Sequence, residues 1–379
     1  MLIINFTVIR HGGGSSYYDL NLFTLLFGLT YIFADLGGGK SAMQRGCTKL
    51  ISPLGLFLAN SFFGLMLGGI FSLAVYISGA TALTALTCLL FFSFAAFSSA
   101  FYSKMEFAGN FKGISIAEVS QSVIYLLAFL VAFRITEDIP LSVSVSAILR
   151  ILSIPISYYL LSRSNQWKES EQSMSISAHF NMTFSGLRYQ MAQGLFVVKD
   201  LILLYFIFSK SDKDLLGNLL FWQSVIFMPL AFMNPISRSV FERATKKLLT
   251  FHDVIKTSLI ILVFIAISEL TIFILMPYII AIFNTSLIDM RLLAILIVAV
   301  LISGSSIPLI SVFSANRSFN RYLLYSTMIF LATVISGLIF RNNYPIDLAY
   351  VIAVCVGHFI NLAFWYWIIR ERRTNEAFG

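Results

Sequence analysis

The fold is decided by stretches such as residues 257–283, which read TSLIILVFIAISELTIFILMPYIIAIF. This run contains a single charged residue, Glu269. About 20 consecutive apolar residues in a helix cross the hydrocarbon core of a bilayer, because a helix satisfies its own backbone hydrogen bonds where no water is present. The stretch therefore predicts a membrane-spanning helix.

Similar apolar runs recur along the whole chain of 379 residues, which is 58% hydrophobic and only 12% charged. Soluble proteins contain roughly 25% charged residues, so a water-soluble fold is excluded. Eleven spans are predicted, near residues 20–36, 51–77, 82–102, 114–133, 140–161, 184–208, 215–236, 257–283, 288–313, 322–340 and 348–369. The sequence thus predicts an all-α, polytopic membrane protein.

Basic residues in the connections predict the orientation, because cytoplasmic loops of membrane proteins carry an excess of Lys and Arg. One set of alternating connections, which includes the C-terminal one, contains seventeen Lys and Arg residues, and the other set contains six. The C-terminus is therefore predicted to be cytoplasmic. Residues 1–9, MLIINFTVI, are apolar but too few to span, so we interpret them as the end of the first helix of a twelve-helix fold.

One polar connection separates the helices into two groups. Residues 162–183 are Ser-rich and predicted to be cytoplasmic, which indicates a linker between an N-terminal bundle (1–161) and a C-terminal bundle (184–379). A weak internal repeat supports this division, since Asp19 and Asp214 each lead into an apolar helix followed by a basic loop. In transporters built from such repeats, the substrate path lies between the halves near the membrane midplane.

Basic residues inside predicted spans are candidate functional residues, because a charge at the bilayer centre costs about 2.5–3.5 kcal/mol on insertion scales. Arg150 lies in the middle of span 140–161, too deep to reach the interface easily, and is expected to line a polar cavity or to form a structural ion pair. Arg188 lies about four residues inside span 184–208. Its side chain is expected to extend to the interface, with a functional contact as the alternative.

Three further charges lie inside spans. Lys199 and Asp200 are adjacent, so they are about 100° apart on a helix and are expected not to face each other. At least one of them then needs a partner on another helix. Glu269 is the candidate partner, and the alternative is that it binds a coupling proton or cation.

Other classes of function receive little support from the composition. The net charge of +8 is explained by the loops that set topology, so no nucleic-acid partner is predicted. The three cysteines are scattered, and the four histidines lack the spacing of metal ligands, so neither a disulfide framework, a metal site nor a cofactor is predicted.

The N-terminal sequence resembles a known family of transporters. The stretch RHGGGSSYYD from Arg10, the apolar helix after it, Asp35 and Gly37 in Ala-Asp-Leu-Gly, and the following Arg45 resemble the opening of polysaccharide and O-antigen flippases. In that family the first of these motifs is a loop. The family belongs to the multidrug/oligosaccharidyl-lipid/polysaccharide exporter (MOP) superfamily, which also contains multidrug-and-toxin-extrusion (MATE) transporters. The missing first helix is a departure from the family pattern.

The resemblance implies a function, which is translocation of undecaprenyl-diphosphate-linked oligosaccharide repeat units across the bacterial inner membrane. Arg150, Lys199 and Arg188 would then contact the diphosphate, and Asp200 and Glu269 would act as counter-ions or in ion coupling. The implied partners are the lipid-linked substrate, membrane lipids, a polysaccharide polymerase and a chain-length regulator. The chain would not be an enzyme.

Three alternatives compete with this interpretation. A multidrug or cation antiporter of the same superfamily is expected to have mainly acidic residues in its cavity, whereas the deep charges here are at least as often basic. An O-antigen polymerase, which is an enzyme, typically has a large periplasmic loop, and the outward connections predicted here are short. The third alternative is that the chain is an inactive fragment of such a transporter.

Overall fold

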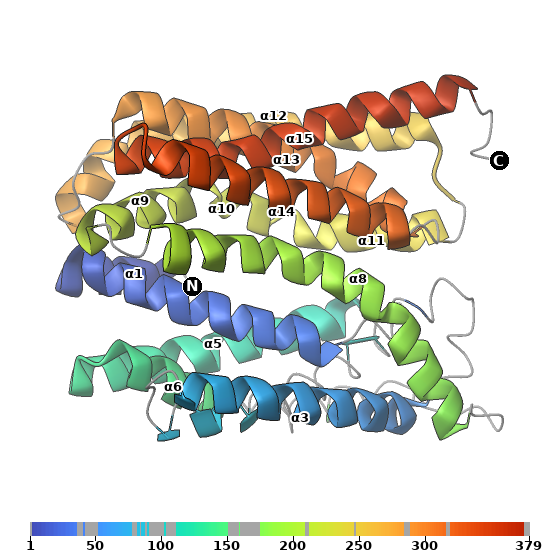
Figure 1. Cartoon of the computed structure of the whole chain (residues 1–379), viewed down its shortest axis with the longest axis horizontal. Coiled ribbons are helices and arrows are strands. Elements are labelled where there is room, and N and C mark those ends of the chain that lie inside the picture. Colours follow the sequence, from blue (N-terminus) through green and yellow to red (C-terminus); the bar gives the residue numbers. More distant parts are fainter. Residues whose placement is uncertain are drawn as a thin grey trace. The chain divides into compact units, whose positions relative to one another are not determined.

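In a computed structural model, every regular element within the described residues is a helix (Figure 1). The structure describes residues 2–35, 41, 52–77, 82–83, 85–87, 89–90, 102–103, 111–150, 159, 175–208, 212–245, 248–283, 289–315 and 319–374. The helices are α1 (Leu2–Asp35), α3 (Pro53–Ile77), α5 (Phe111–Thr136), α6 (Ile139–Arg150), α8 (Ile176–Ile202), the π-helix η3 (Leu203–Ile207), α9 (Lys213–Ile226), α10 (Met228–Ala231), α11 (Asn234–Thr245), α12 (Phe251–Phe283), α13 (Met290–Ala315), α14 (Phe319–Arg341) and α15 (Ile346–Thr374). The predicted all-α fold is confirmed.

The longest apolar helices have the length and composition of membrane spans. Five such segments occur within the described residues: Gly113–Thr136, Phe251–Phe283, Met290–Val312, Asn320–Arg341 and Ile346–Phe364. They coincide with predicted spans. In α12, Ile260, Ile267 and Ile274 are about 60% exposed and lie seven residues apart on one face. Such a stripe is unfavourable in water and is expected where a helix faces lipid.

The predicted span 215–236 is wrong as a single helix, because the chain is broken there into α9, α10 and the start of α11. Pro229 has no backbone N–H, so it cannot donate the hydrogen bond that an α-helix requires at this position. The Leu230 amide instead donates to the Phe227 carbonyl, three residues earlier. Pro277 and Pro308, by contrast, lie inside the continuous helices α12 and α13.

Helix α1 contains a kink at Gly13, where φ is 68° and ψ is −165°. A positive φ of this kind favours glycine. After the kink, the Ser15 amide donates to the Asp214 carboxylate of α9 at 2.7 Å, as a capped helix N-terminus would. The sequence Arg10 to Asp19, expected to be a loop before the first span, is therefore helical on both sides of this kink.

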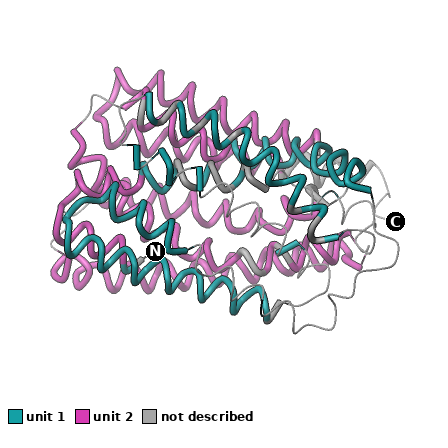
Figure 2. Tube along the Cα trace, turned by 90° about the horizontal axis from the view of Figure 1, so that it is seen from below, with its two compact units in different colours: residues 1, 3, 22–194 teal, residues 2, 4–21, 195–379 magenta. Residues whose placement is uncertain are grey.

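The described residues form two compact units (Figure 2). The first unit contains residues 22–194, with α3, α5, α6 and parts of α1 and α8. Within it, α5 packs against α6, and Phe180 of α8 contacts the rings of Phe62 and Phe63 of α3. Residues 175–183, expected to end the linker, lead into and form the start of α8, whereas residues 162–174 lie outside the described part of the chain.

The second unit contains residues 4–21 and the chain from Leu195 onward. In this unit α13 packs against α11, α12, α14 and α15, and α14 also packs along α15. Its core includes the fully buried Trp222 and Tyr350. Gly14 of α1 and Gly217 of α9 lie so close together that a Cβ atom on Gly217 would overlap the Gly14 carbonyl oxygen.

Candidate functional site

Arg150 lies at the end of the described part of α6, eleven residues after Ile139 and so about 17 Å along the helix axis. In a span that begins near Ile139, as the sequence predicts, that distance corresponds to the middle of a hydrocarbon core of roughly 30 Å. The half-buried guanidinium group donates to the side-chain oxygen of Gln121 on α5 at 3.1 Å, and Gln121 is itself buried. The Arg150 Nε has no acceptor in the described part of the chain. Among the residues that the structure describes, its positive charge thus has a neutral amide as partner and no acidic one.

Arg188 lies near the middle of α8, and its side chain is exposed. The helix itself begins at Ile176, eight residues before the predicted start of the span at residue 184. About 18 Å of helix therefore separate Arg188 from that end. The expectation that the side chain extends to the membrane interface stays a prediction.

Lys199 and Asp200 form an ion pair with each other, with 2.6 Å between the Lys199 Nζ and an Asp200 Oδ1. The expectation that neighbours in sequence cannot meet is wrong here. The four-carbon lysine side chain is flexible enough to turn around the helix surface to the adjacent carboxylate. Only 7% of the Lys199 side chain and 25% of the Asp200 side chain are exposed. The pair is therefore largely self-neutralised.

We expect Lys199→Met to lower the stability of the protein by about 3 kcal/mol, because it leaves the Asp200 carboxylate without its partner. The double variant Lys199→Met/Asp200→Asn should recover most of this loss. Thermal unfolding of the purified protein in detergent measures both effects. If the double variant were as unstable as the single one, the pair would not be the source of the effect.

Glu269 lies in the middle of α12 and is only 4% exposed. It shares the buried face of this helix with Ile261, Ile265, Ile272 and Met276. Neither carboxylate oxygen accepts a hydrogen bond from the residues that the structure describes. The candidate pairing of Glu269 with Lys199 is thus not found among the described residues, and its alternative role in binding a coupling proton or cation stays a prediction.

The second unit also contains buried polar groups that the sequence analysis did not single out. The Tyr350 hydroxyl donates to the Gln223 side chain at 3.1 Å, and Ser303 and His358 are hydrogen-bonded to each other. In sequence these residues are isolated polar positions in apolar runs, and only their common orientation toward the bundle interior distinguishes them.

The residues of the family motif are only partly described. Arg10 is exposed on α1, and Asp35 is the last residue of that helix. Gly37 and Arg45 lie outside the described residues. The structure adds Asp214 to this region, because its carboxylate binds the Ser15 amide and the preceding residue, Lys213, contacts Asp19 at 3.4 Å.

The candidate residues of the two units therefore differ in charge. The first unit contains Arg150, which has a neutral partner, and the exposed Arg188. The second unit contains the self-paired Lys199 and Asp200 and the buried Glu269. A basic side chain with a neutral partner, Arg150, thus lies in the first unit, and a buried carboxylate, Glu269, lies in the second.

Comparison with known proteins identifies the fold. No model of a protein family matches the chain, and no curated protein is similar to it in sequence. A MOP-superfamily transporter from Pyrococcus furiosus superposes with a TM-score of 0.71 and 14% identity over 98% of this chain and 90% of that one. An outward-facing multidrug-resistance MATE transporter gives 0.69 and 14% over 98% and 91%. A Vibrio cholerae MATE transporter gives 0.66 and 16% over 99% and 93%. The chain therefore has the fold of MATE transporters, which are polytopic helical membrane proteins.

Proposed function

We propose that this protein is a transporter that moves undecaprenyl-diphosphate-linked oligosaccharides, such as O-antigen repeat units, across the bacterial inner membrane by alternating access. The fold is compatible with transport, and the charge of the first unit suits an anionic substrate. The proposal includes a cytoplasmic C-terminus, a non-enzymatic role, and a polysaccharide polymerase and a chain-length regulator as partners.

The fold alone does not select the substrate, because one fold supports many functions and the site decides among them. The Pyrococcus furiosus protein of the same fold is described as having a binding pocket of reverse polarity, which suggests a different function for it. Pocket charge is therefore the property on which the choice of substrate depends. In this chain we infer the charge of the pocket from the basic residues inside the predicted spans, Arg150, Arg188 and Lys199.

The environment of Arg150 is the observation that carries the proposal. A cation at this depth costs about 2.5–3.5 kcal/mol, and Gln121 offsets only part of that cost because it is neutral. An anionic diphosphate would supply the missing countercharge and accept the hydrogen bond that Nε does not make. Retention of such a group is expected where a phosphate-bearing head group passes.

The other candidate residues have more limited roles in this proposal. Arg188 is exposed at the middle of α8, where its guanidinium group can contact a phosphate. Lys199 can do so only if the substrate displaces Asp200. Asp200 and Glu269 are assigned to charge balance and ion coupling.

Transport can be tested with purified protein in proteoliposomes. A lipid-linked diphosphate oligosaccharide with a fluorescent label is placed in both leaflets, and an impermeant quencher reports how fast the inner-leaflet label reaches the outside. We expect faster exchange than in protein-free liposomes and no accumulation of a cationic dye such as ethidium. Dye accumulation without lipid exchange would contradict the proposal and support a multidrug antiporter.

A cation antiporter is the second candidate function, and Glu269 is the observation that favours it. A buried carboxylate with no hydrogen-bond donor suits a cationic substrate or a coupling ion equally well. We assign it to the coupling ion, because Lys199 and Arg150 make the remaining deep charge no more acidic than basic.

We expect Glu269→Gln to reduce gradient-driven transport at least about tenfold, since the amide cannot take up a coupling ion. The stability should change by no more than about 1 kcal/mol, because no described hydrogen bond is lost. Exchange measured with and without a proton or sodium gradient reports the coupling. Glu137→Gln, at an exposed position, is the matched control. Unchanged gradient dependence in Glu269→Gln would remove this residue from coupling.

A further inference from the structure

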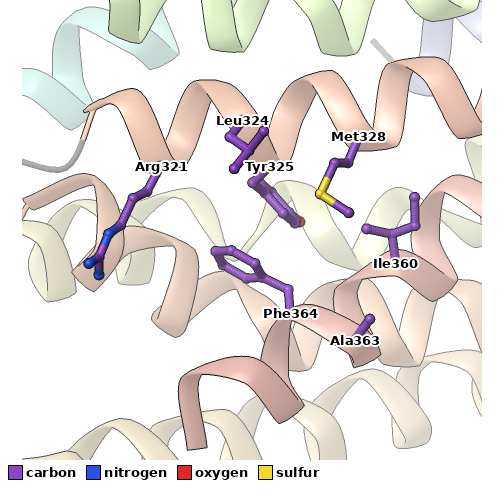
Figure 3. A pocket seen from close by; sticks show the side chains of 7 residues that line it. All are labelled: Arg321, Leu324, Tyr325, Met328, Ile360, Ala363 and Phe364. Carbon is purple, nitrogen blue, oxygen red and sulfur yellow. The ribbon is translucent and has the colours of Figure 1, made fainter. Parts of the chain in front are cut away.

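A groove of about 220 Å³ lies between α14 and α15 in the second unit. Figure 3 shows the residues that line it, with Arg321 at one end of the row and the apolar side chains beside it. The lining residues are Arg321, Leu324, Tyr325, Met328, Ile360, Ala363 and Phe364. The groove is therefore lined by apolar and aromatic side chains and has one cationic end.

The groove opens on a face of α14 that has the character of a lipid-facing surface. Leu324 is 58% exposed and Met328 is 49% exposed. The same face continues with Leu331, Ile335 and Leu338, each about half exposed. A contiguous apolar stripe on a membrane-spanning helix faces acyl chains rather than water. A ligand in this groove can thus enter from the bilayer.

The polar groups beneath the groove bind each other and leave its wall apolar. The buried Tyr325 hydroxyl donates to the side-chain oxygen of Asn361. The ring of Phe364 packs 4.4 Å from the Tyr325 ring, measured between centroids. These contacts join α14 to α15 and fix the floor. The groove is therefore formed before any ligand arrives.

Arg321 provides the only charge among the lining residues and lies in the first turn of α14. The positive end of the helix dipole and the guanidinium both favour an anion at this point. The connection that leads into α14 belongs to the set with the excess of basic residues, so this end of α14 is predicted to lie on the cytoplasmic side. Anionic lipids bind basic pockets between helices on that side of a membrane. The end of the groove is thus complementary to a lipid phosphate.

We propose that this groove binds an anionic phospholipid of the cytoplasmic leaflet, with part of one acyl chain between α14 and α15 and the phosphate at Arg321. The volume of about 220 Å³ is below the roughly 300–1,000 Å³ of sites for drug-sized ligands, so it suits a narrow chain segment. The site is independent of what the protein transports, since none of its residues belongs to the candidate transport site.

Native mass spectrometry of the purified full chain in detergent can test this site, with phosphatidylglycerol as the anionic probe and phosphatidylcholine as the neutral one. We expect wild-type protein to retain phosphatidylglycerol more tightly. Arg321→Gln should weaken phosphatidylglycerol binding about fivefold, as one basic residue near a membrane surface predicts, and leave phosphatidylcholine binding unchanged.

Two further variants separate the groove from general surface charge. Ala363→Phe places a ring in the groove from an exposed position and should weaken both lipids at least fivefold while leaving the protein folded. Arg341→Gln, at the other end of α14, should change binding less than twofold. Equal binding of the two lipids by wild type, equal effects of the two arginine variants, or full lipid binding by Ala363→Phe would each overturn the proposal.

Discussion

Arg150→Ala is expected to slow transport of a diphosphate-linked lipid strongly while the protein still inserts into the membrane at the wild-type level. A hydrogen bond to a charged group contributes about 1.5–3 kcal/mol, so the rate of lipid exchange should fall at least about tenfold. Surface polysaccharide in a strain that lacks its own O-antigen flippase provides a second measurement. Full polysaccharide in the variant would remove Arg150 from the mechanism.

Three controls separate the charge of Arg150 from its structural contact. Arg150→Lys keeps the charge and should retain part of the activity. Gln121→Leu removes the neutral partner, and should reduce transport less than Arg150→Ala because the cation remains. Arg134→Ala removes an exposed arginine from the last turn of α5 and should be nearly silent. A large loss in all of these variants would indicate a general defect in folding.

Gly217→Ala is expected to lower the stability of the protein by about 3 kcal/mol, at the upper end of the cost of overpacking. The added methyl group would overlap the Gly14 carbonyl oxygen, and a backbone atom cannot move aside as a flexible side chain can. The α1–α9 contact would have to separate. The midpoint of thermal unfolding in detergent measures the change.

Gly69→Ala in α3 is the matched control for this substitution, because nothing lies within 4 Å of a Cβ atom at that position. The same methyl group should there leave the midpoint unchanged or raise it slightly, since alanine favours helix more than glycine does. Equal midpoints for the two variants would contradict the close helix contact.

Apolar patterns predicted the five spans found among the described residues, because a helix that crosses lipid needs about 20 consecutive, mostly apolar residues. The uninterrupted run 257–283 was recognised on this basis and lies within α12. The break of the helix at Pro229 was not predicted. Pro277 and Pro308 also lack a backbone N–H, yet their helices are continuous, so the sequence does not distinguish the three positions. The presence of a proline therefore does not by itself decide whether a helix ends there.

The candidate site was predicted less completely, for a related reason. Charge and depth identify Arg150 and Glu269 in the sequence, but their partners are set by side-chain conformation and helix packing. The pairing of Lys199 with Asp200 depends on the flexibility of one side chain, which the 100° step between neighbours does not describe. His358 was recognised only as a residue without metal-ligand spacing, because its contact with Ser303 spans 55 residues.

The packing of residues 4–21 within the second unit has a consequence for biosynthesis. Ser15 binds Asp214, which is 199 residues later in the chain, and Asn5 donates to Ser224. At about 5–20 residues per second, the ribosome needs roughly 10–40 s to produce these partners. The helical turns of residues 4–21 must therefore wait for these partners, and this segment completes the second unit only after residues 214–224 have been synthesised.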